Sequence, residues 1–440
     1  MPPSDPDAAP AVLAPLGGPR LRVLVSAFAT SPIGGSEPGL GWNIVSRLAR
    51  WHDVTVLCTP GMPGERNFRQ EIDTALRRSG PIPGLTLRYV PPPPLSRLLQ
   101  SEGILRRRTV YYAGYRSWQQ AAYKMALALH REAPFDLTHH LSMTGYREPG
   151  FLWKLSIPFV WGPIEGGENI PSDYLCLMGG WEKAFYVLRN MINDLQKAHH
   201  RRARAAAHAA RHIWAVGGHN AEMVRRCWGR GAELVVENGA QAPCGSPRSY
   251  DRSRPLRLVW VGKHIGRKAL PILLHALARM EGPAPCEMVV IGEGPQTEAW
   301  TKLAVRLGVA ERIRWTGSIP HDAVLAEIRD ADALAHTSLI EGTSAVILEA
   351  LASGAPVLCH DTGGMGVAVT PGCGIKVPLN DVSTSIAGFQ AALERLHREP
   401  GLVGRLSAGA LARAQELSWD TLARRIAERY GQVVATAPRG

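Results

Sequence analysis

The sequence lacks any uninterrupted run of about 18 apolar residues, which is the length that a helix needs to cross a bilayer. We therefore expect no transmembrane helix. The first segment is rich in proline and alanine, but it has neither a basic start nor a sustained apolar core. We expect residues 1–19 to form a disordered leader and not a secretory signal.

Cysteine is scarce and poorly placed for a structural role. Seven cysteines are scattered through 440 residues, and no C-x-x-C pair occurs. This pattern argues against a disulfide framework and against a structural zinc site, and it fits the reducing cytoplasm. No G-x-x-x-x-G-K-[ST] motif occurs, and the glycines of VVIGEGP (289–295) do not form G-x-G-x-x-G, so P-loop and dinucleotide sites are disfavoured.

The net charge of +12 is unevenly distributed. Residues 1–250 carry 29 Lys and Arg against 19 Asp and Glu, whereas residues 251–440 carry 21 against 19. A basic first half suits an anionic membrane surface or an acidic substrate, and a merely solvated basic face explains it equally well. No nucleic-acid-binding module is recognisable, so we expect no nucleic acid partner.

Short β-rich runs alternate with helical stretches along the whole chain. Apolar strands separated by helices predict parallel sheets covered on both faces, and two such series predict two doubly wound α/β domains. The expected strands are 21–29, 53–58, 85–90, 136–142, 158–163, 212–217, 233–239, 256–262, 287–294, 312–318, 333–338 and 356–360.

The same pattern suggests domain boundaries. We expect an N-terminal Rossmann-like domain at 20–241 and a C-terminal one at 256–417. The polar stretch 242–255 is rich in proline and glycine and is the expected linker. The last helix, within 418–440, is expected to pack back on the N-terminal domain.

The segment from Glu341 to Glu349 combines a phosphate site with a carboxylate in apolar company. Gly342 and Thr343 break the chain before a predicted helix at 344–353, whose free N–H groups and partial positive charge suit a phosphate. Glu349 lies among apolar residues, and such a carboxylate is costly unless it is hydrogen-bonded. Ribose hydroxyls of a bound nucleotide would satisfy it, as would a cap or a pair inside the protein.

Two further segments after predicted strands carry suitable chemistry. Lys263 and Lys268 follow the strand that ends at Gly262, and such cations can neutralise a diphosphate leaving group. The glycines of VVIGEGP allow a close backbone approach. A D-x-D at Asp330 and Asp332 could bind a metal, but its place between a helix and a strand favours a cap, and we expect no metal ion.

Taken together, residues 256–379 resemble the C-terminal half of the group 1 (family 4) retaining glycosyltransferases, which have the two-domain GT-B fold. Four features carry the resemblance through their order and spacing: GK…K at 262–268, IGEGP at 291–295, WTGSIP at 315–320 and EGTSAVILEALASGAPVL at 341–358. The resemblance implies two Rossmann-like domains that face each other across a cleft.

The resemblance also implies a donor site. Glu341 would lie near the sugar, and Glu349 would bind the ribose. The other donor-binding residues are backbone or hydroxyl donors in loops: Gly262, Gly292, Gly294, Ser318, Gly342, Thr343 and Ser344. The base would be read by backbone groups near Ser318.

Lys263 and Lys268 would stabilise the departing diphosphate, and they also mark two departures from the family pattern. The first cation is usually Arg, so the bidentate phosphate contact of a guanidinium would be lost at Lys263. Lys268 is usually followed by glycine, and here Ala269 follows it.

The N-terminal half resembles the family more loosely. Gly34 and Gly35 look like its glycine loop, and SEPGLGW (36–42) is similar to members that build bacterial polysaccharides and glycolipids. DLTHHLS (136–142) looks like the strand whose histidine faces the transferred sugar. We assign that role to His139, with His140 as the alternative register.

The implied activity is metal-independent transfer, with retention of configuration, from a UDP- or GDP-linked sugar to a hydroxyl acceptor, without a cofactor. The acceptor would be a carbohydrate, a lipid-linked sugar or a small molecule. Alternatives are a soluble natural-product acceptor, a non-catalytic sugar-nucleotide-binding protein and a sugar-nucleotide epimerase. We expect a cytoplasmic protein with peripheral contact to an anionic membrane, through residues 97–129.

Overall fold

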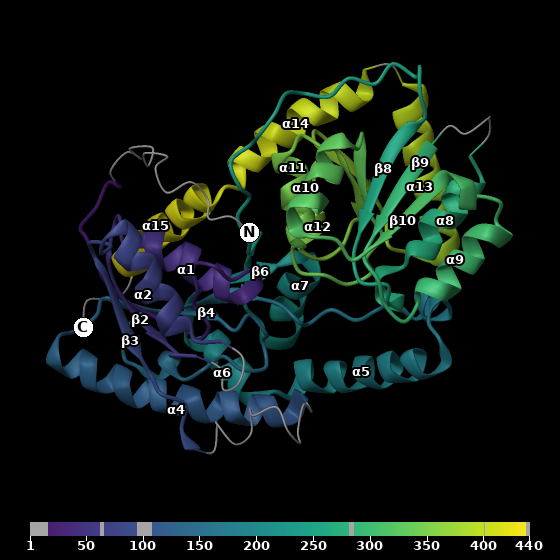
Figure 1. Cartoon of the computed structure of the whole chain (residues 1–440). Coiled ribbons are helices and arrows are strands. Elements are labelled where there is room, and N and C mark those ends of the chain that lie inside the picture. Colours follow the sequence, from purple (N-terminus) through teal and green to yellow (C-terminus); the bar gives the residue numbers. More distant parts are fainter. Residues whose placement is uncertain (1–15, 62–65, 95–107, 281–285, 400, 437–440) are drawn as a thin grey trace.

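The computed structural model describes residues 16–61, 66–94, 108–280, 286–399 and 401–436, which form two parallel α/β units facing each other (Figure 1). Residues 1–15 of the expected leader, and residues 97–107 of the expected membrane segment, lie outside this part of the chain. Among the described helices, none is long and apolar enough to cross a membrane.

The first unit is built on a seven-stranded sheet in the order β3-β2-β1-β4-β5-β6-β7, and its neighbouring strands pair in parallel. Its strands are β1 (Arg22–Ala27), β2 (Asp53–Cys58), β3 (Leu85–Tyr89), β4 (Leu137–Ser142), β5 (Phe159–Ile164), β6 (Ala210–Val216) and β7 (Glu233–Val235). Its helices are α1 (Ser36–Leu48), α2 (Phe68–Ser79), α4 (Arg108–Glu132), α5 (Gly180–His199), α6 (Arg201–Ala209) and α7 (Gly217–Trp228), with short 3₁₀ turns η1 (Leu152–Lys154) and η2 (Ser172–Leu177).

The second unit has a six-stranded parallel sheet in the order β10-β9-β8-β11-β12-β13. Its strands are β8 (Leu256–Val261), β9 (Cys286–Ile291), β10 (Ile313–Gly317), β11 (Ala333–His336), β12 (Val357–His360) and β13 (Gly374–Val377). Its helices are α8 (Leu270–Ala278), α9 (Thr297–Arg306), α10 (His321–Asp330), α11 (Ala345–Ala352), α12 (Gly363–Ala368), α13 (Val382–Arg398) and α14 (Leu402–Glu416), with 3₁₀ turns η3 (Gly266–Lys268) and η4 (Ala310–Arg312).

The expected fold class is confirmed, and each of the twelve expected strands is present within a few residues. The sequence reading missed β13, because four residues that begin with glycine and follow a proline-glycine turn carry little strand signal.

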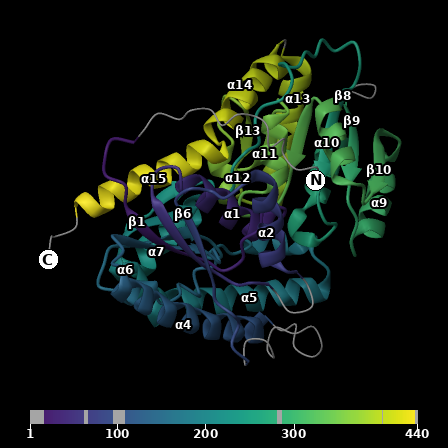
Figure 2. The ribbon, with the colours of Figure 1, turned by 60° about the vertical axis from the view of Figure 1, so that its left-hand side comes forward.

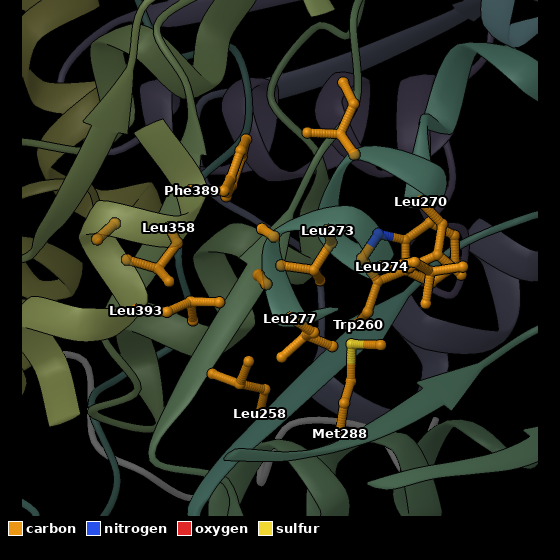
Figure 3. Packing of buried hydrophobic residues seen from close by; sticks show 14 of the residues in the cluster. Leu258, Trp260, Leu270, Leu273, Leu274, Leu277, Met288, Leu358, Phe389 and Leu393 are labelled. Atoms are coloured by element: carbon orange, nitrogen blue, oxygen red, sulfur yellow. The ribbon is translucent and has the colours of Figure 1, made fainter. Parts of the chain in front are cut away.

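The core of the second unit shows why its strands are apolar on both sides. Leu258 and Trp260 of β8 pack against the leucines of α8, with Phe389 and Leu393 of α13 beside them (Figure 3). The opposite face of the sheet is covered by α11 and its neighbours, which form a separate apolar cluster. Burial on both faces leaves only the strand ends free for polar chemistry.

Two segments cross between the units. The last helix, α15 (Trp419–Ala435), leaves the second unit and packs against α1, where Arg47 Nε lies 2.9 Å from Asp420 Oδ1. In the opposite direction, Tyr174 of η2 is buried in the second unit's core and its hydroxyl lies 2.6 Å from Ser385 Oγ. From there α5 runs back along the lower side of the molecule (Figure 1).

The irregular stretch 242–255 is held to the second unit by Arg248. Its guanidinium donates to backbone carbonyls at the C-terminal ends of α10 and α11, including Ala331 at 2.6 Å, Ser353 at 2.8 Å and Gly354 at 2.9 Å. These carbonyls have no partner within their helices, and a cation at a helix C-terminus is electrostatically favourable. One side chain therefore satisfies two helix ends.

We predict that Arg248→Ala lowers the free energy of unfolding of the second unit by about 2–4 kcal/mol, because several part-buried carbonyls at helix ends lose the donor that Arg248 provides. Arg252→Ala, in the same stretch but at an exposed side chain, is the control and should change it little. Chemical denaturation followed by circular dichroism measures both. Equal effects of the two changes would show that the contacts of Arg248 are not specific.

Candidate functional site

Glu341, in the loop after β11, forms the centre of the site. Its Oε2 atom accepts hydrogen bonds from Arg267 Nη1 at 2.6 Å, Lys268 Nζ at 3.0 Å and Ser338 Oγ at 2.9 Å. Burial opposes the charge of this carboxylate, but Lys268 and Arg267 outweigh it and lower the pKa of Glu341 to about 2. The carboxylate is therefore ionised at any physiological pH.

The two cations reach Glu341 because of a tight turn after β8. Residues 266–268 form η3, and Ala269 then adopts a left-handed conformation with φ of 48°, which favours glycine. The glycine that the family pattern implies after Lys268 would adopt this conformation without strain. Lys268 is buried, whereas Lys263 is exposed and makes no ion pair with any residue that the structure describes.

Glycines at the ends of β8 and β9 allow the neighbouring loops to touch. The Gly262 amide donates to the carbonyl of Ile291 at 3.0 Å, and the Gly292 amide donates to the carbonyl of Gly317 at 2.9 Å. Gly292 has a φ of 120°, and a side chain there would collide with the backbone of Gly262. The expected donor-binding residues of these loops therefore lie at one edge of the sheet. They are Gly262 after β8, Gly292 and Gly294 after β9, and the exposed Ser318 after β10.

The N-terminus of α11 lies at the same edge. Ser344 is the N-cap of α11, and the preceding Thr343 donates through its amide and its hydroxyl to the carboxylate of Glu237, from the loop after β7. Glu349 lies on α11 with its Oε1 atom 3.7 Å from His321 Nε2. Burial raises the pKa of Glu349, with His321 opposing the change.

The first unit contributes carboxylates that approach Gly342 closely. A side chain at Gly342 would begin 2.6 Å from Glu237 Oε1 and 2.8 Å from Glu165 Oε2, so it would have to displace these carboxylate groups. Thr144, just beyond β4, donates through its hydroxyl to Glu165 at 2.7 Å and through its amide to Glu37 at 2.9 Å.

Glu37 lies in the first turn of α1, two residues after Gly35, which is the N-cap of that helix. The expected glycine loop is therefore at the cleft end of the first sheet. Within the described residues, no hydrogen bond joins Gly34 or Gly35 to the second unit, whereas Glu37 is tied to the cleft through Thr144.

These buried carboxyl groups hold protons more tightly than usual. Burial, with the nearby charges of Glu165 and Glu237, raises the pKa of Glu168 to about 8. Burial, with Glu165, raises the pKa of Glu237 to about 7. Near neutral pH this wall of the cleft therefore carries less negative charge than its composition indicates, and protonated carboxyl groups can donate hydrogen bonds.

A pocket of about 290 Å³ opens between the two walls. Arg267, Glu341 and Gly342 line it from the second unit, and Glu165 and Glu168 line it from the first. Phe185, Tyr186 and Arg189 of α5 also line it. A cationic loop, a helix N-terminus and several hydroxyl-binding carboxyl groups suit a ligand that combines phosphate with sugar hydroxyls.

His139 does not reach this pocket. Its Nδ1 atom lies 2.5 Å from the Tyr430 hydroxyl and its Nε2 atom 2.7 Å from the Gly162 carbonyl, so α15 and β5 occupy both ring nitrogens. Side chains alternate along β4, and this one points into the core under α15, while burial lowers its pKa to about 4. His140 points to the other face and is also buried. The residue that reaches the cleft from β4 is Thr144.

The D-x-D pair has a structural explanation. Asp332 accepts two hydrogen bonds from Arg254, at 2.6 and 2.8 Å, and one from the Arg257 amide at 2.8 Å. It stands before β11, at the opposite end of the sheet from Glu341. Asp332 is therefore the acceptor that anchors the start of β8.

Glu168 and Glu237 were not singled out from the sequence. Each stands directly after a buried strand or in a glycine-rich loop at a strand end, which is a usable signal. Their significance depends on the opposite unit: Glu168 lines the pocket together with Gly342, and Glu237 accepts hydrogen bonds from Thr343.

Solved structures that resemble the whole chain define its fold. Sucrose-phosphate synthase from Thermosynechococcus elongatus aligns with a TM-score of 0.59 and 17% identity, covering 95% of this chain and 100% of that one. The apo form of the lipopolysaccharide outer core galactosyltransferase WaaB aligns with a TM-score of 0.59 and 15% identity, covering 92% and 98%. Anabaena HepE in complex with UDP-glucose aligns with a TM-score of 0.55 and 15% identity, covering 93% and 100%. The chain has the GT-B fold.

Sequence comparison then defines the family. Residues 255–398 match the family model described as glycosyl transferases group 1, and the second unit belongs to that family. The D-inositol 3-phosphate glycosyltransferase of Streptomyces bingchenggensis is 35% identical over 228 residues, which are 49% of this chain and 47% of that protein. The glycogen synthase of Mycobacterium tuberculosis is 30% identical over 202 residues, which are 44% and 47%. This chain thus spans about half the length of the curated relatives that it matches.

The raised pKa of Glu168 predicts a specific dependence of stability on pH. The folded state holds this proton up to about pH 8, whereas the unfolded chain releases it near pH 4.5. The stabilising contribution is therefore complete below about pH 4.5 and is lost as the pH rises through about 8. Glu168→Gln should gain melting temperature relative to the natural protein between pH 6 and 9.

Differential scanning fluorimetry across that pH range measures this difference. The control Glu298→Gln, at an exposed carboxylate of α9, should show a difference that does not change with pH. A constant offset for Glu168→Gln would contradict the assignment of a proton to this site.

Proposed function

We propose that this protein is a retaining glycosyltransferase that moves a sugar from a nucleoside-diphosphate sugar to a hydroxyl group, in the assembly of a polysaccharide or glycolipid. The observation that carries the proposal is Glu341, held ionised by Lys268 and Arg267 beside the N-terminus of α11. The family of the second unit supports it, as do the complexes of the structural relative HepE with UDP and with UDP-glucose.

The charges of the second unit suit a diphosphate. Lys263, Arg267 and Lys268 supply three positive charges near the end of β8, and Glu341 offsets one of them. The remainder matches the two negative charges of a diphosphate diester. The amides at the start of α11 supply further donors without added charge. Glu349, half-buried one turn further along, is then placed to accept hydrogen bonds from ribose hydroxyls.

In the proposed reaction the bond between the anomeric carbon and the diphosphate oxygen breaks, and a bond to the acceptor oxygen forms on the same face. The acceptor proton passes to the departing phosphate. Lys263 and Lys268 stabilise the negative charge that builds up on the leaving group, and Glu341 positions the sugar. The protein supplies orientation and electrostatic stabilisation.

A thermal-shift panel of UDP-, GDP-, ADP- and TDP-sugars tests the proposal, since a ligand that binds only the folded state raises the melting temperature. With the nucleotide so identified, Glu349→Ala should weaken its binding about 10- to 100-fold through the loss of ribose contacts. Lys268→Ala should lower kcat by about 100-fold with a smaller effect on binding, because the charge develops in the transition state.

Lys302→Ala, at an exposed lysine of α9, is the matched control and should keep natural rates and affinities. If Glu349→Ala and Lys268→Ala also behave like the natural protein, the donor site lies elsewhere. Nucleotide-sugar binding without transfer or hydrolysis would instead indicate a non-catalytic binding protein, and a 2-epimer formed without acceptor would indicate an epimerase.

The contact between Glu237 and Thr343 leads to a further prediction about the donor. An ionised Glu237 competes with the distal phosphate for the Thr343 amide and repels it. At pH 8, above its pKa of about 7, Glu237→Gln should bind the nucleotide sugar about three- to tenfold more tightly than the natural protein. At pH 6 the two should converge, because Glu237 is then protonated.

Isothermal titration calorimetry at both pH values measures the two affinities. A nucleotide sugar is the suitable ligand, because its two phosphates stay ionised throughout this range. Glu222→Gln, at a surface carboxylate of α7, is the control. Weaker binding by Glu237→Gln at both pH values would show that Glu237 supports the donor and does not compete with it.

A further inference from the structure

Helix α5 is amphipathic, but its apolar face is exposed and its polar face is turned toward the protein. Seven of the ten large apolar side chains that are exposed in the described part of the protein lie on this one helix. The exposed fraction is 89% for Trp181, 57% for Leu188 and 61% for Leu195. A surface helix usually turns its apolar face inward, so this stripe is a feature to be explained.

The stripe is continuous and uncharged. At 100° of rotation per residue, its members fall within an arc of about 160° that contains no Lys, Arg, Asp or Glu. From Trp181 to Leu195 it is about 21 Å long. Its largest members are Trp181, Phe185, Leu188, Met191, Ile192 and Leu195.

The polar face of α5 is committed to the protein, so the helix cannot simply turn over. Asn193 is fully buried and its amide donates to the Gly167 carbonyl at 3.1 Å. Lys197 donates to the same carbonyl at 3.1 Å. At the other end, Glu182 accepts from the Gly266 amide of the second unit at 3.0 Å. Hydrogen bonds at both ends and in the middle therefore fix the apolar stripe toward the outside.

The helices on this side of the molecule carry an excess of basic residues. Helices α4, α5 and α6 run along the same lower side of the molecule in both views (Figures 1 and 2). Together these three helices carry ten Lys and Arg against three Asp and Glu. The exposed ones include Lys124, Lys183, Arg201 and Arg204.

We propose that this side of the protein, the α5 face, docks on an anionic lipid bilayer with the apolar stripe of α5 buried among the headgroups. An uncharged apolar stripe, on a side whose three helices carry more basic than acidic residues, is complementary to such a surface. Two copies of the α5 face would bring like charges together, which disfavours a dimer through it.

The sequence analysis predicted that residues 97–129 contact the membrane, and we now assign that contact to α5. The apolar side chains of its described part belong to α4, and Tyr115, Trp118, Ala122 and Ala126 are buried against the first sheet. They are not available to a bilayer, and α4 contributes positive charge only.

Docking would place the bilayer beside the candidate active site. Phe185 belongs both to the stripe and to the lining of the pocket that contains Glu341. An acceptor carried by a lipid could then enter the pocket without leaving the membrane surface. This consequence rests on the proposed glycosyltransferase function, whereas the docking itself does not.

Vesicle flotation of the full chain tests the α5 face. The double variant Leu188→Glu and Leu195→Glu should partition into phosphatidylcholine vesicles that contain phosphatidylglycerol at least about tenfold less than the natural protein, because it places charge within the stripe. Val305→Glu is the matched control, since Val305 is 63% exposed on α9, away from this side, and it should float like the natural protein. Binding should weaken at high salt and with vesicles of phosphatidylcholine alone.

Trp181→Ala provides a second, milder variant that removes apolar area without adding charge, and it should reduce partitioning in the same direction. The thermal shift by a nucleotide sugar is measured for every variant, so that loss of vesicle binding is separated from loss of folding or of the donor site. A protein that binds vesicles through α5 but shows no nucleotide-sugar shift would retain the docking surface and lose the proposed function.

Two outcomes overturn the docking proposal. One is that the natural protein fails to float with anionic vesicles, or that the α5 variants float as well as it does. The other is a dimer, detected by light scattering, that the double variant abolishes while vesicle binding is absent, which would make a second copy the occupant of the stripe.

Discussion

The ion pairs of the half-buried Glu341 with Arg267 and Lys268 are the interaction on which the site depends. It joins the loop after β11 to the turn after β8, so the two central strands of the second sheet present one rigid cationic surface. A carboxylate buried here without those cations would be strongly destabilising, and the cations without it would repel each other. The turn that delivers Lys268 requires Ala269 in a left-handed conformation, a local cost that this ion pair offsets.

The two units are joined by more contacts than the linker at 242–255 alone would provide. Besides the linker held by Arg248, two segments cross between the units: α15, and η2 with the start of α5. The buried carboxyl groups of the first unit also meet the start of α11 directly, through Glu237 and Thr343. The cleft between the sheets is therefore a shared site in which one wall supplies cations and the other supplies carboxyl groups with raised pKa values. Helix α5 contributes Phe185, Tyr186 and Arg189 to the lining of the pocket, between the residues of the two units.

Several features of this site could be read from residue order. Continuous apolar runs imply parallel strands, and parallel strands place their ends at one edge, so segments at 262–268, 291–295 and 341–349 are expected to meet there, as they do. The strand β13 carried too short a pattern to be recognised. The resemblance of DLTHHLS to a family strand assigned His139 to the cleft, but α15, almost three hundred residues later in the chain, provides the hydroxyl that holds it in the core.

The sequence by itself determined the fold class, the approximate position of twelve strands and the loops that line the second unit's wall, because periodicity and glycine spacing are local properties of the chain. Only the tertiary structure decided which carboxyl groups face that wall, why Glu168 and Glu237 keep their protons, and which face of α5 is left outside. These features depend on contacts between residues that are far apart in the sequence. The local sequence pattern does not show which distant residues will meet, so it cannot predict them. For α5 the local pattern shows an amphipathic helix, and the hydrogen bonds of Asn193 and Lys197 then turn its polar side inward.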